Sequence, residues 1–363
     1  MKNKIITISF IVILFGIFGA NLIIKDTEIS ISERRKLAKF PEINSEDLLN
    51  GKWTKDFEDY TQDQFVERDL FKNVKSFWSI NIFNQKDNNK MFEKDGALYK
   101  MEYPLSESNV RKNAEKIKNV YDKYLSGKKV YFSIIPEKNY YLNDEHLLMD
   151  YNKIEEIMKS NLNNSKDTNN FEYINIFDEL KLEDYYKTDL HWRQENLLNV
   201  AGKISTSMGL DNVSNVNYEK ENIGKFYGTY YGQITSSKVE PDDMFILTND
   251  TIKNSVTYNF ETQKEGNVYY RKETKDKYDI YVSGATPLIT ITNENAKENK
   301  ELLLFRDSFG SSLAPLLVEN YKTITLIDLR YISSEILDKF IEFEDQDVLF
   351  LYSSLILNQN VLK

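Results

Sequence analysis

The first strong feature of the hydrophobic pattern is an uninterrupted apolar stretch near the amino terminus. After the opening MKNK, no residue from Ile5 to Ile24 carries a charge. A helix of this length can cross a lipid bilayer. A core helix as long as this would normally carry a polar edge. We therefore expect residues 1–24 to form a transmembrane signal-anchor helix.

The charges around this stretch bear on its orientation. Lys2 and Lys4 favour an amino terminus that stays in the cytoplasm, whereas Lys25 and the basic residues after it pull the other way. The short leading tail and the lack of a second apolar span favour a single-pass protein whose main body lies outside the cell membrane. The sequence GIFGA weakly resembles a signal-peptidase site, so secretion after cleavage is the alternative.

The next part of the chain, residues 25–90, reads as a stalk followed by amphipathic helices. Residues 25–50 mix charges with a proline and show little periodicity. Residues 51–85 place aromatic and aliphatic side chains near helical spacing, including Trp53, Phe57 and Phe71. The simplest interpretation is that these side chains dock the helices on the main body.

Short apolar strands then alternate with helical runs. We predict strands at 128–135, 171–177, 301–305, 323–328 and 347–352, and helices at 108–125, 151–161, 311–320, 332–342 and from about Glu195 to Gly209. Such alternation indicates parallel βαβ units and a three-layer α/β/α sandwich. Residues 212–298 break the pattern and are rich in Tyr, Thr, Asn and Gly. We expect residues 91–363 to form one α/β domain with a β-rich lobe inserted at about 212–298.

Composition narrows the chemistry. The net charge of −10 argues against nucleic acid or an anionic lipid surface as the main partner. With no cysteine, the chain has no disulfides, zinc–thiolate sites or thiol nucleophile. The chain has only two histidines that could take part in imidazole chemistry, His146 and His191. His146 lies in an acidic context and is expected on the surface. Neither histidine has further ligands at metal-site spacing, so we expect no metal and no cofactor.

The segment YKTDLHWRQENLL contains the more promising histidine. In a turn or extended segment, Asp189 and His191 point the same way. The carboxylate can then hold the Nδ1–H of the imidazole and stabilise the imidazolium that forms during proton transfer. The segment precedes a predicted helix, at the sheet edge where open α/β sheets bind ligands.

The segment ELLLFRDSFGSSLAP supplies a nucleophile. Ser308 follows a predicted strand and precedes a predicted helix, whose first N–H groups and dipole can face an oxyanion. Gly310 lets the chain approach closely. The competing interpretation is that Asp307 and Ser308 simply cap the helix. Asp307 is too close in sequence to serve easily as the triad acid.

Taken together, SERRKLAKFPE, FEDYTQDQFVERDLF, TDLHW and LLLFRDSFGSSLAPLL resemble the DHHW family. That family is similar to the alginate O-acetylation proteins, which carry an SGNH-hydrolase-like domain. The resemblance maps the Asp-x-His-Trp element onto Asp189, His191 and Trp192, and the nucleophile onto Ser308. Leu190 stands where the family motif has a second histidine. By resemblance, a membrane-bound O-acyltransferase in the same system supplies the acetyl group.

Four further residues are expected to contact substrate. Arg306 flanks the nucleophile, and Trp192 follows the histidine. Lys138, in SIIPEKNYYL, resembles the family's Pro-x-Lys segment, with a surface lysine as the equal alternative. Tyr230, in FYGTYYGQ, is a candidate wall of a sugar groove, although such tyrosines are more often sheet residues.

These observations predict a membrane-anchored, extracytoplasmic O-acetyltransferase or acetylesterase that acts on a cell-surface or secreted polysaccharide. Ser308 is the predicted nucleophile, His191 the general base and Asp189 the residue that orients it. The alternative is a catalytically inactive glycan-binding or scaffold subunit of a polysaccharide modification or export complex. The two differ in whether Ser308 and His191 lie within hydrogen-bond reach.

Overall fold

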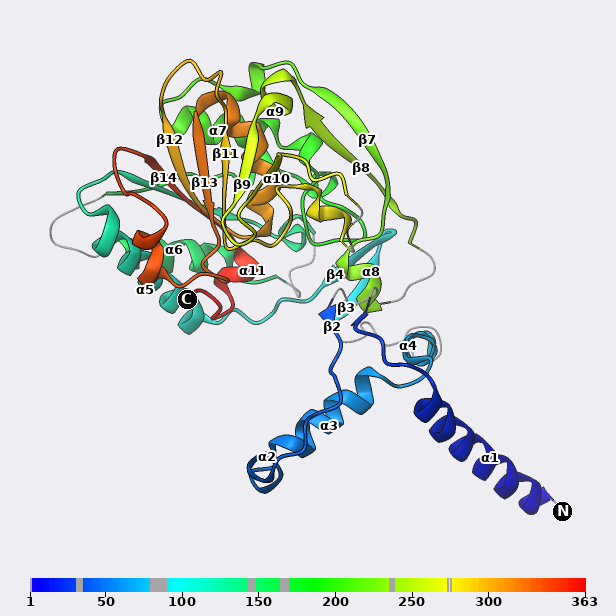
Figure 1. Cartoon of the computed structure of the whole chain (residues 1–363). Coiled ribbons are helices and arrows are strands. Elements are labelled where there is room, and N and C mark those ends of the chain that lie inside the picture. Colours follow the sequence, from blue (N-terminus) through cyan, green and yellow to red (C-terminus); the bar gives the residue numbers. More distant parts are fainter. Residues whose placement is uncertain are drawn as a thin grey trace. The chain divides into compact units, whose positions relative to one another are not determined.

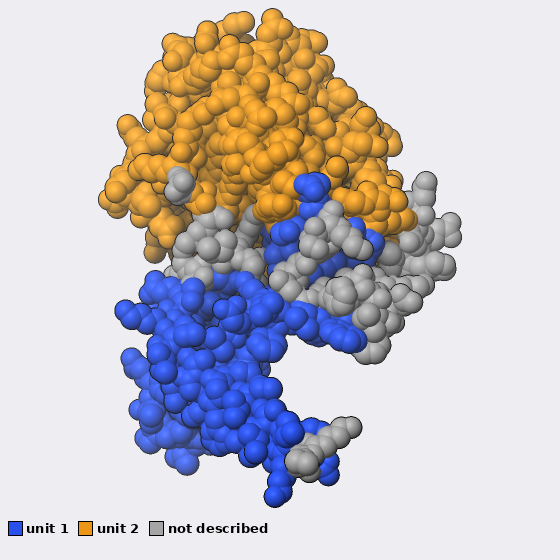
Figure 2. All heavy atoms as spheres, turned by 90° about the vertical axis from the view of Figure 1, so that its right-hand side faces the viewer, with its two compact units in different colours: residues 1–93, 229–240 blue, residues 94–228, 241–363 orange. Residues whose placement is uncertain are grey.

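The computed structural model of the chain describes residues 2–30, 35–78, 90–142, 148–163, 170–234, 239–272, 274 and 276–363. The chain divides into two compact units, coloured separately in Figure 2. The first comprises residues 1–93 and 229–240, and the second comprises residues 94–228 and 241–363. His146 falls outside the described residues, so the prediction that it lies on the surface stays a prediction.

The first unit contains mostly helices. Its elements are α1 (Lys2–Ile23), β1 (Ile29–Ser30), β2 (Arg35–Lys36), α2 (Ser45–Leu49), α3 (Lys52–Asp63), α4 (Arg68–Phe77) and α8 (Thr229–Ile234). The apolar segment Asn3–Ile23 of α1 is long and apolar enough to cross a membrane, and none of it is buried inside the protein. It is therefore a candidate anchor or signal sequence. The chain passes from this unit to the next within β3 (Met91–Lys94).

The second unit is built on an eight-stranded mixed sheet (Figure 1). Its strand order is β10 (Lys264–Asn267), β9 (Val256–Asn259), β11 (Leu288–Thr292), β13 (Thr323–Ile327), β12 (Glu301–Arg306), β14 (Asp347–Ser353), β5 (Val130–Ile135) and β6 (Phe171–Tyr173). The five strands from β13 to β6 are parallel. They include every strand that the apolar runs predicted.

Each face of the sheet borders its own hydrophobic core. Along β12, Leu302 and Leu304 belong to the core that contains residues of α7 (Leu198–Ser207) and α10 (Ser308–Leu317). Leu303 and Phe305 belong to the opposite core, with residues of α5 (Glu107–Val120) and α6 (Tyr151–Leu162). This alternation follows from the two-residue period of a strand that is buried on both faces.

The predicted β-rich lobe needs correction. Strands β9, β10 and β11 extend the central sheet in antiparallel fashion. Only β7 (Glu219–Phe226) and β8 (Asp242–Thr248) form a separate two-stranded ribbon. The sheet is therefore mixed rather than parallel. The hydrophobic pattern did not reveal this because the outermost strand, β10, is exposed along its whole length.

The remaining elements of the second unit connect the sheet strands. They are β4 (Ala97–Lys100), the π-turn at Tyr121–Leu125, α9 (Asp250–Asn254), α11 (Ser354–Leu357), and 3-10 turns at Lys138–Tyr141, Phe177–Glu179, Leu182–Asp184, Gln194–Asn196, Val213–Asn215, Lys277–Ile280, Val318–Asn320 and Ser334–Lys339. The helix predicted at 332–342 is thus a shorter 3-10 helix, Ser334–Lys339. The carboxyl ends of β5, β12 and β14 share one edge of the sheet, where the predicted site residues follow.

Candidate active site

Ser308 is the first residue of α10 and follows the end of β12 directly. Asp307 caps this helix, because its Oδ1 accepts the backbone N–H of Phe309 at 3.0 Å. Its Oδ2 accepts the backbone N–H and the hydroxyl of Ser353, at 2.8 and 2.6 Å, and so ties the turn to the end of β14. Asp307 is thus the helix cap, and the role of Ser308 as nucleophile stays a prediction.

Asp189 and His191 lie on a tight loop between Tyr185 and Trp192, which form an isolated antiparallel bridge. The carboxylate of Asp189 accepts the backbone N–H of His191 at 2.9 Å, closing a turn across one residue. The same oxygen lies 2.5 Å from His191 Nδ1. One carboxylate thus fixes both the backbone and the ring of the histidine, and this contact makes Nδ1 the protonated nitrogen of the neutral ring.

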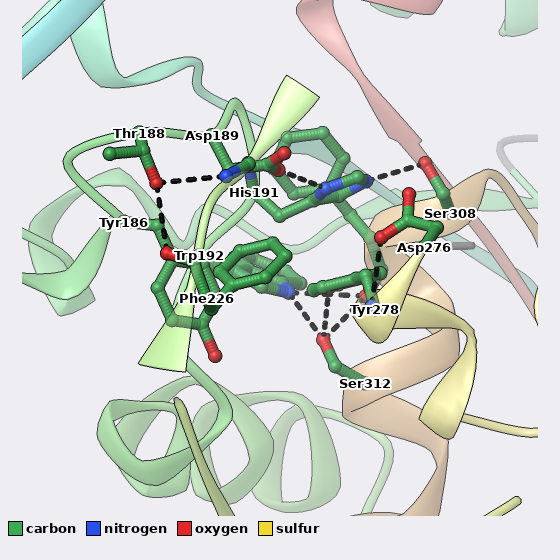
Figure 3. A network of polar contacts seen from close by, with 12 residues as sticks. Tyr186, Thr188, Asp189, His191, Trp192, Phe226, Asp276, Tyr278, Ser308 and Ser312 are labelled. Atoms are coloured by element: carbon green, nitrogen blue, oxygen red, sulfur yellow. Dashed lines mark hydrogen bonds and ion pairs between the residues drawn. The ribbon is translucent and has the colours of Figure 1, made fainter. Parts of the chain in front are cut away.

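The three predicted residues meet in space (Figure 3). His191 Nε2 lies 2.8 Å from Ser308 Oγ, although the residues are 117 positions apart. Asp189 is fully buried, His191 is 6% exposed, and Ser308 is half-buried. A base that is hydrogen-bonded to the nucleophile, and is itself held by a buried carboxylate, is the arrangement of a serine triad.

The His191 ring is held between two aromatic side chains. Tyr278 lies parallel to it, with ring centroids 3.9 Å apart and an interplanar angle of 13°. Phe309 contacts it from another direction, at 4.8 Å. Tyr278 is itself fixed by a 2.8 Å hydrogen bond from its hydroxyl to Ser312 Oγ, and burial raises its pKa well above the usual value. The sequence analysis did not identify Tyr278.

The side chain of Trp192 is completely buried, and its contact with substrate stays a prediction. Its indole N–H donates to the carbonyl of Phe309 at 3.1 Å and to Ser312 Oγ at 2.8 Å. The indole also packs edge-on against the Phe309 ring. Trp192 therefore joins the histidine loop to the first turn of α10, which carries the serine.

A second carboxylate, that of Asp242 at the start of β8, binds the backbone of the loop that carries His191. Its oxygens accept the backbone N–H groups of Lys187 and Thr188, each at 2.9 Å, and the Thr188 hydroxyl at 2.7 Å. Arg193 completes the arrangement with a 2.5 Å ion pair to the same carboxylate. Asp242 is buried, and no local sequence signal pointed to it.

Gly228 is a further support that the sequence analysis missed. A β-carbon at this position would lie 2.2 Å from Asp189 Cβ and 2.5 Å from the Thr188 carbonyl oxygen. The Gly228 N–H also donates to the Thr188 hydroxyl at 2.9 Å. The chain passes so close to the Asp189 loop that only glycine fits there.

Lys138 is also buried, and its contact with substrate stays a prediction. Its ammonium donates to the backbone carbonyls of Tyr186, Lys187 and Asp189, at 3.0, 3.3 and 2.8 Å. Burial lowers the pKa of Lys138 to about 7. Burial likewise raises the pKa of the neighbouring Glu137 to about 8. Lys138 thus holds the backbone of the loop that carries Asp189.

Arg306 and Tyr230 are both buried, and the contact of Arg306 with substrate stays a prediction. Arg306 is completely buried and forms an ion pair with Asp328 at 3.4 Å, and burial lowers its pKa. Its aliphatic chain also lies under Gly310, where a β-carbon would come within 2.6 Å of Arg306 Cβ. Tyr230 belongs to α8 in the first unit and is buried. Its contact with substrate stays a prediction.

Among the described residues, no group of three His, Asp or Glu side chains converges on a point that would hold a metal ion. At the site, the Ser308 hydroxyl faces an imidazole, and the positive end of α10 lies beside it. A helix end of this kind can stabilise a negatively charged oxygen.

The fold and the site together define a mixed α/β domain with a Ser-His-Asp arrangement at the carboxyl edge of its parallel strands. The chain belongs to the DHHW protein family, because the sequence model of that family matches residues 102–327. No curated protein matches the sequence.

Solved structures share the fold. A DHHW family protein from Eubacterium siraeum DSM 15702 aligns with a TM-score of 0.61 and 20% identity, over 76% of this chain and 97% of that one. PatB1 of Bacillus cereus, solved with a sulfonyl adduct, aligns with a TM-score of 0.57 and 18% identity, over 75% and 96% of the two chains. The O-acetyltransferase domain of Pseudomonas putida AlgJ aligns less closely, with a TM-score of 0.44 and 12% identity over 73% and 91%.

Proposed function

We propose that the chain is a membrane-anchored, extracytoplasmic O-acetyltransferase or acetylesterase that acts on a cell-surface or secreted polysaccharide. Its catalytic domain is an SGNH-hydrolase-like α/β/α sandwich of three layers. The observation that carries the proposal is the 2.8 Å distance between His191 Nε2 and Ser308 Oγ, with Asp189 bonded to the other ring nitrogen. The same distance favours an enzyme over an inactive scaffold subunit.

In the first step, Ser308 Oγ attacks the carbonyl carbon of an acetyl ester while its proton moves to His191 Nε2. Asp189 stabilises the imidazolium that results. The backbone N–H of Ser308, at the amino end of α10, stabilises the oxyanion. When the tetrahedral intermediate collapses, the bond to the donor oxygen breaks, and that oxygen takes the proton from His191.

In the second step, the acetyl group leaves Ser308. A sugar hydroxyl gives its proton to His191 and attacks the acetyl carbon, and Ser308 Oγ departs with that proton. Water in place of the sugar hydroxyl makes the same reaction an ester hydrolysis. The balance between transfer and hydrolysis therefore depends on how well the site holds the glycan and excludes water.

Three features support the biological setting. Helix α1 has the length and apolar composition of a membrane anchor. The chain belongs to the DHHW family, which resembles the alginate O-acetylation proteins. A membrane-bound O-acyltransferase is the proposed acetyl donor, because a polysaccharide acetylated outside the cell needs its acetyl group delivered across the membrane.

The direct test is acetate release from an aryl acetate ester by the full-length protein in detergent. We compare the wild type with Ser308→Ala and His191→Ala. The matched control is Ser311→Ala, a buried serine one turn further along α10. The proposal expects both triad variants to lose release and the control to keep it. Equal release by all four proteins would refute a triad centred on Ser308.

A further inference from the structure

Helix α4 carries an apolar stripe that the proposed reaction does not use. Leu70, Phe71, Val74 and Trp78 are between 46% and 54% exposed. Leu70, Val74 and Trp78 follow one another at four-residue spacing, so they share one side of the helix. The expectation that such side chains dock on the main body stays a prediction. An exposed apolar stripe of this kind marks a surface that meets something other than water.

The start of α4 lies beside the carboxyl end of α1. The backbone N–H of Val66, two residues before α4, donates to the side-chain oxygen of Asn21 in the last turn of α1, at 2.9 Å. Ile24 and Lys25, which follow α1, line the same cavity as residues 65–69. In Figure 1, α4 is seen nearly end-on, whereas α1 extends lengthwise across the view. The two helices thus meet at their ends and run in very different directions.

The composition of α4 fits one environment in particular. Tryptophan and phenylalanine prefer the boundary between lipid headgroups and acyl chains. Lys72 and Lys75 belong to the same helix, and lysine side chains extend toward headgroups while their stems cover apolar surface. A short helix with an apolar stripe and basic residues is typical of segments that lie in the plane of a membrane surface.

We propose that α4 is an interfacial helix, which rests its Leu70, Phe71, Val74 and Trp78 stripe in the outer headgroup region of the bilayer that α1 spans. This inference rests on the membrane anchoring included in the proposed function. We expect lipid to cover this stripe, because α4 begins at the depth where α1 leaves the apolar layer of the bilayer. A helix that starts at that level and turns away from the membrane normal stays at the surface of the bilayer.

The lack of native cysteine makes a clean test feasible. Full-length protein is reconstituted in phosphatidylcholine–phosphatidylglycerol vesicles, with one introduced cysteine that carries an environment-sensitive fluorophore. The test variant is Val74→Cys. Asp69→Cys, an exposed position on the opposite side of α4, is the matched control. Ile13→Cys reports on α1, and Glu115→Cys, an exposed position on α5, reports on the catalytic unit.

The readouts are quenching by nitroxide lipids labelled near the headgroup or deep in the acyl chain, and quenching by aqueous iodide. We expect the label at position 74 to be quenched several-fold more by headgroup-level nitroxide than the label at position 69. We also expect it to be protected from iodide. The label at position 13 should be quenched by deep nitroxide, and the label at position 115 by iodide alone.

Three results would overturn the inference. In the first, iodide quenches the label at position 74 freely while the label at position 13 lies deep. This result would support the membrane anchor and contradict the interfacial helix. Protection of position 74 from both iodide and nitroxide lipid would mean that protein covers the stripe. A label at position 13 in water would remove the anchor as well. None of these results bears on ester cleavage by Ser308, which the aryl acetate assay tests separately.

Discussion

His191 and Ser308 are 117 residues apart in the chain, yet their side chains meet with 2.8 Å between Nε2 and Oγ. The serine is fixed by the cap and first turn of α10, and the histidine by a loop that rests on the same turn through Trp192. Because both partners are held by buried groups, little rearrangement is needed before the base can accept the hydroxyl proton. The predictions below follow from this supported geometry.

Replacing Asp189 with asparagine should lower kcat roughly 10³- to 10⁴-fold, because an amide cannot stabilise the imidazolium and does not enforce the same tautomer. The measurement is steady-state aryl acetate hydrolysis. The free energy of unfolding should be recorded in parallel, since Asp189 also closes the loop through the His191 N–H. A variant that folds normally and keeps full activity would show that Asp189 is not the triad acid.

Gly228→Ala should disturb the geometry of the site, although Gly228 itself takes no part in the proposed reaction. The new β-carbon would overlap Asp189 and the Thr188 carbonyl, so the loop must shift or the fold must strain. We expect a loss of about 1–3 kcal/mol of stability from overpacking, and roughly a 100-fold loss of kcat from misplacement of the acid. Urea unfolding and ester hydrolysis measure the two effects.

The control for Gly228 is Gly266→Ala in β10. There the nearest atom to an added β-carbon is the Thr257 hydroxyl oxygen, at 3.2 Å, far from the triad. This variant should keep its activity. If Gly228→Ala keeps the same activity as the control, the close approach of Gly228 to Asp189 is not needed for activity.

Tyr278 should contribute through its ring rather than its hydroxyl. The ring face lies against the imidazole, where it can stabilise the positive charge that forms during proton transfer, by roughly 1–2 kcal/mol. We expect Tyr278→Leu to lower kcat about tenfold with little change in KM. Tyr278→Phe keeps the stack and should recover most of the rate. Equal losses in both variants would instead assign the effect to the Ser312 hydrogen bond.

Glu137 should make stability depend on pH. Burial raises its pKa to about 8 from the ordinary value of 4.5, so the folded state binds more protons than the unfolded state between these values. The stabilisation from this group is complete below the unfolded pKa and is lost as the pH rises through the folded pKa. Wild type should therefore lose stability between pH 5 and pH 8 relative to Glu137→Gln.

Urea denaturation of the two proteins at pH 5 and pH 8 tests this directly. The variant keeps an acceptor for the Tyr151 hydroxyl, which bonds to Glu137 at 2.9 Å, and it does not titrate. A stability difference between the two proteins that stays constant across the range would show that Glu137 is ionised in the folded protein at both pH values.

The sequence predicted the triad because its signals are local. TDLHW places an acid and a base one residue apart, and a strand–turn–helix pattern exposes Ser308. The supporting residues gave no such signal. Asp242 and Gly228 reach the loop from the β7–β8 region, and their importance comes from contacts with residues at least 39 positions away. Only the folded chain reveals such contacts.

The sequence did not show that the predicted substrate contacts are buried. Arg306, Lys138 and Trp192 all lie next to the predicted loops, and their polar groups suggested a role toward a ligand. In the folded chain those groups bond to an aspartate, to backbone carbonyls, and to the first turn of α10. Sequence proximity to a site places a residue near the chemistry, but it does not say whether the side chain faces the groove or the core.

The most direct test of the central claim is covalent labelling of the nucleophile. Full-length protein is treated with a sulfonyl fluoride, and the modified peptide is identified by mass spectrometry. The account predicts one adduct, on Ser308, which is absent from Ser308→Ala and forms far more slowly in His191→Ala. Labelling at another residue, or an equal rate with and without His191, would contradict it.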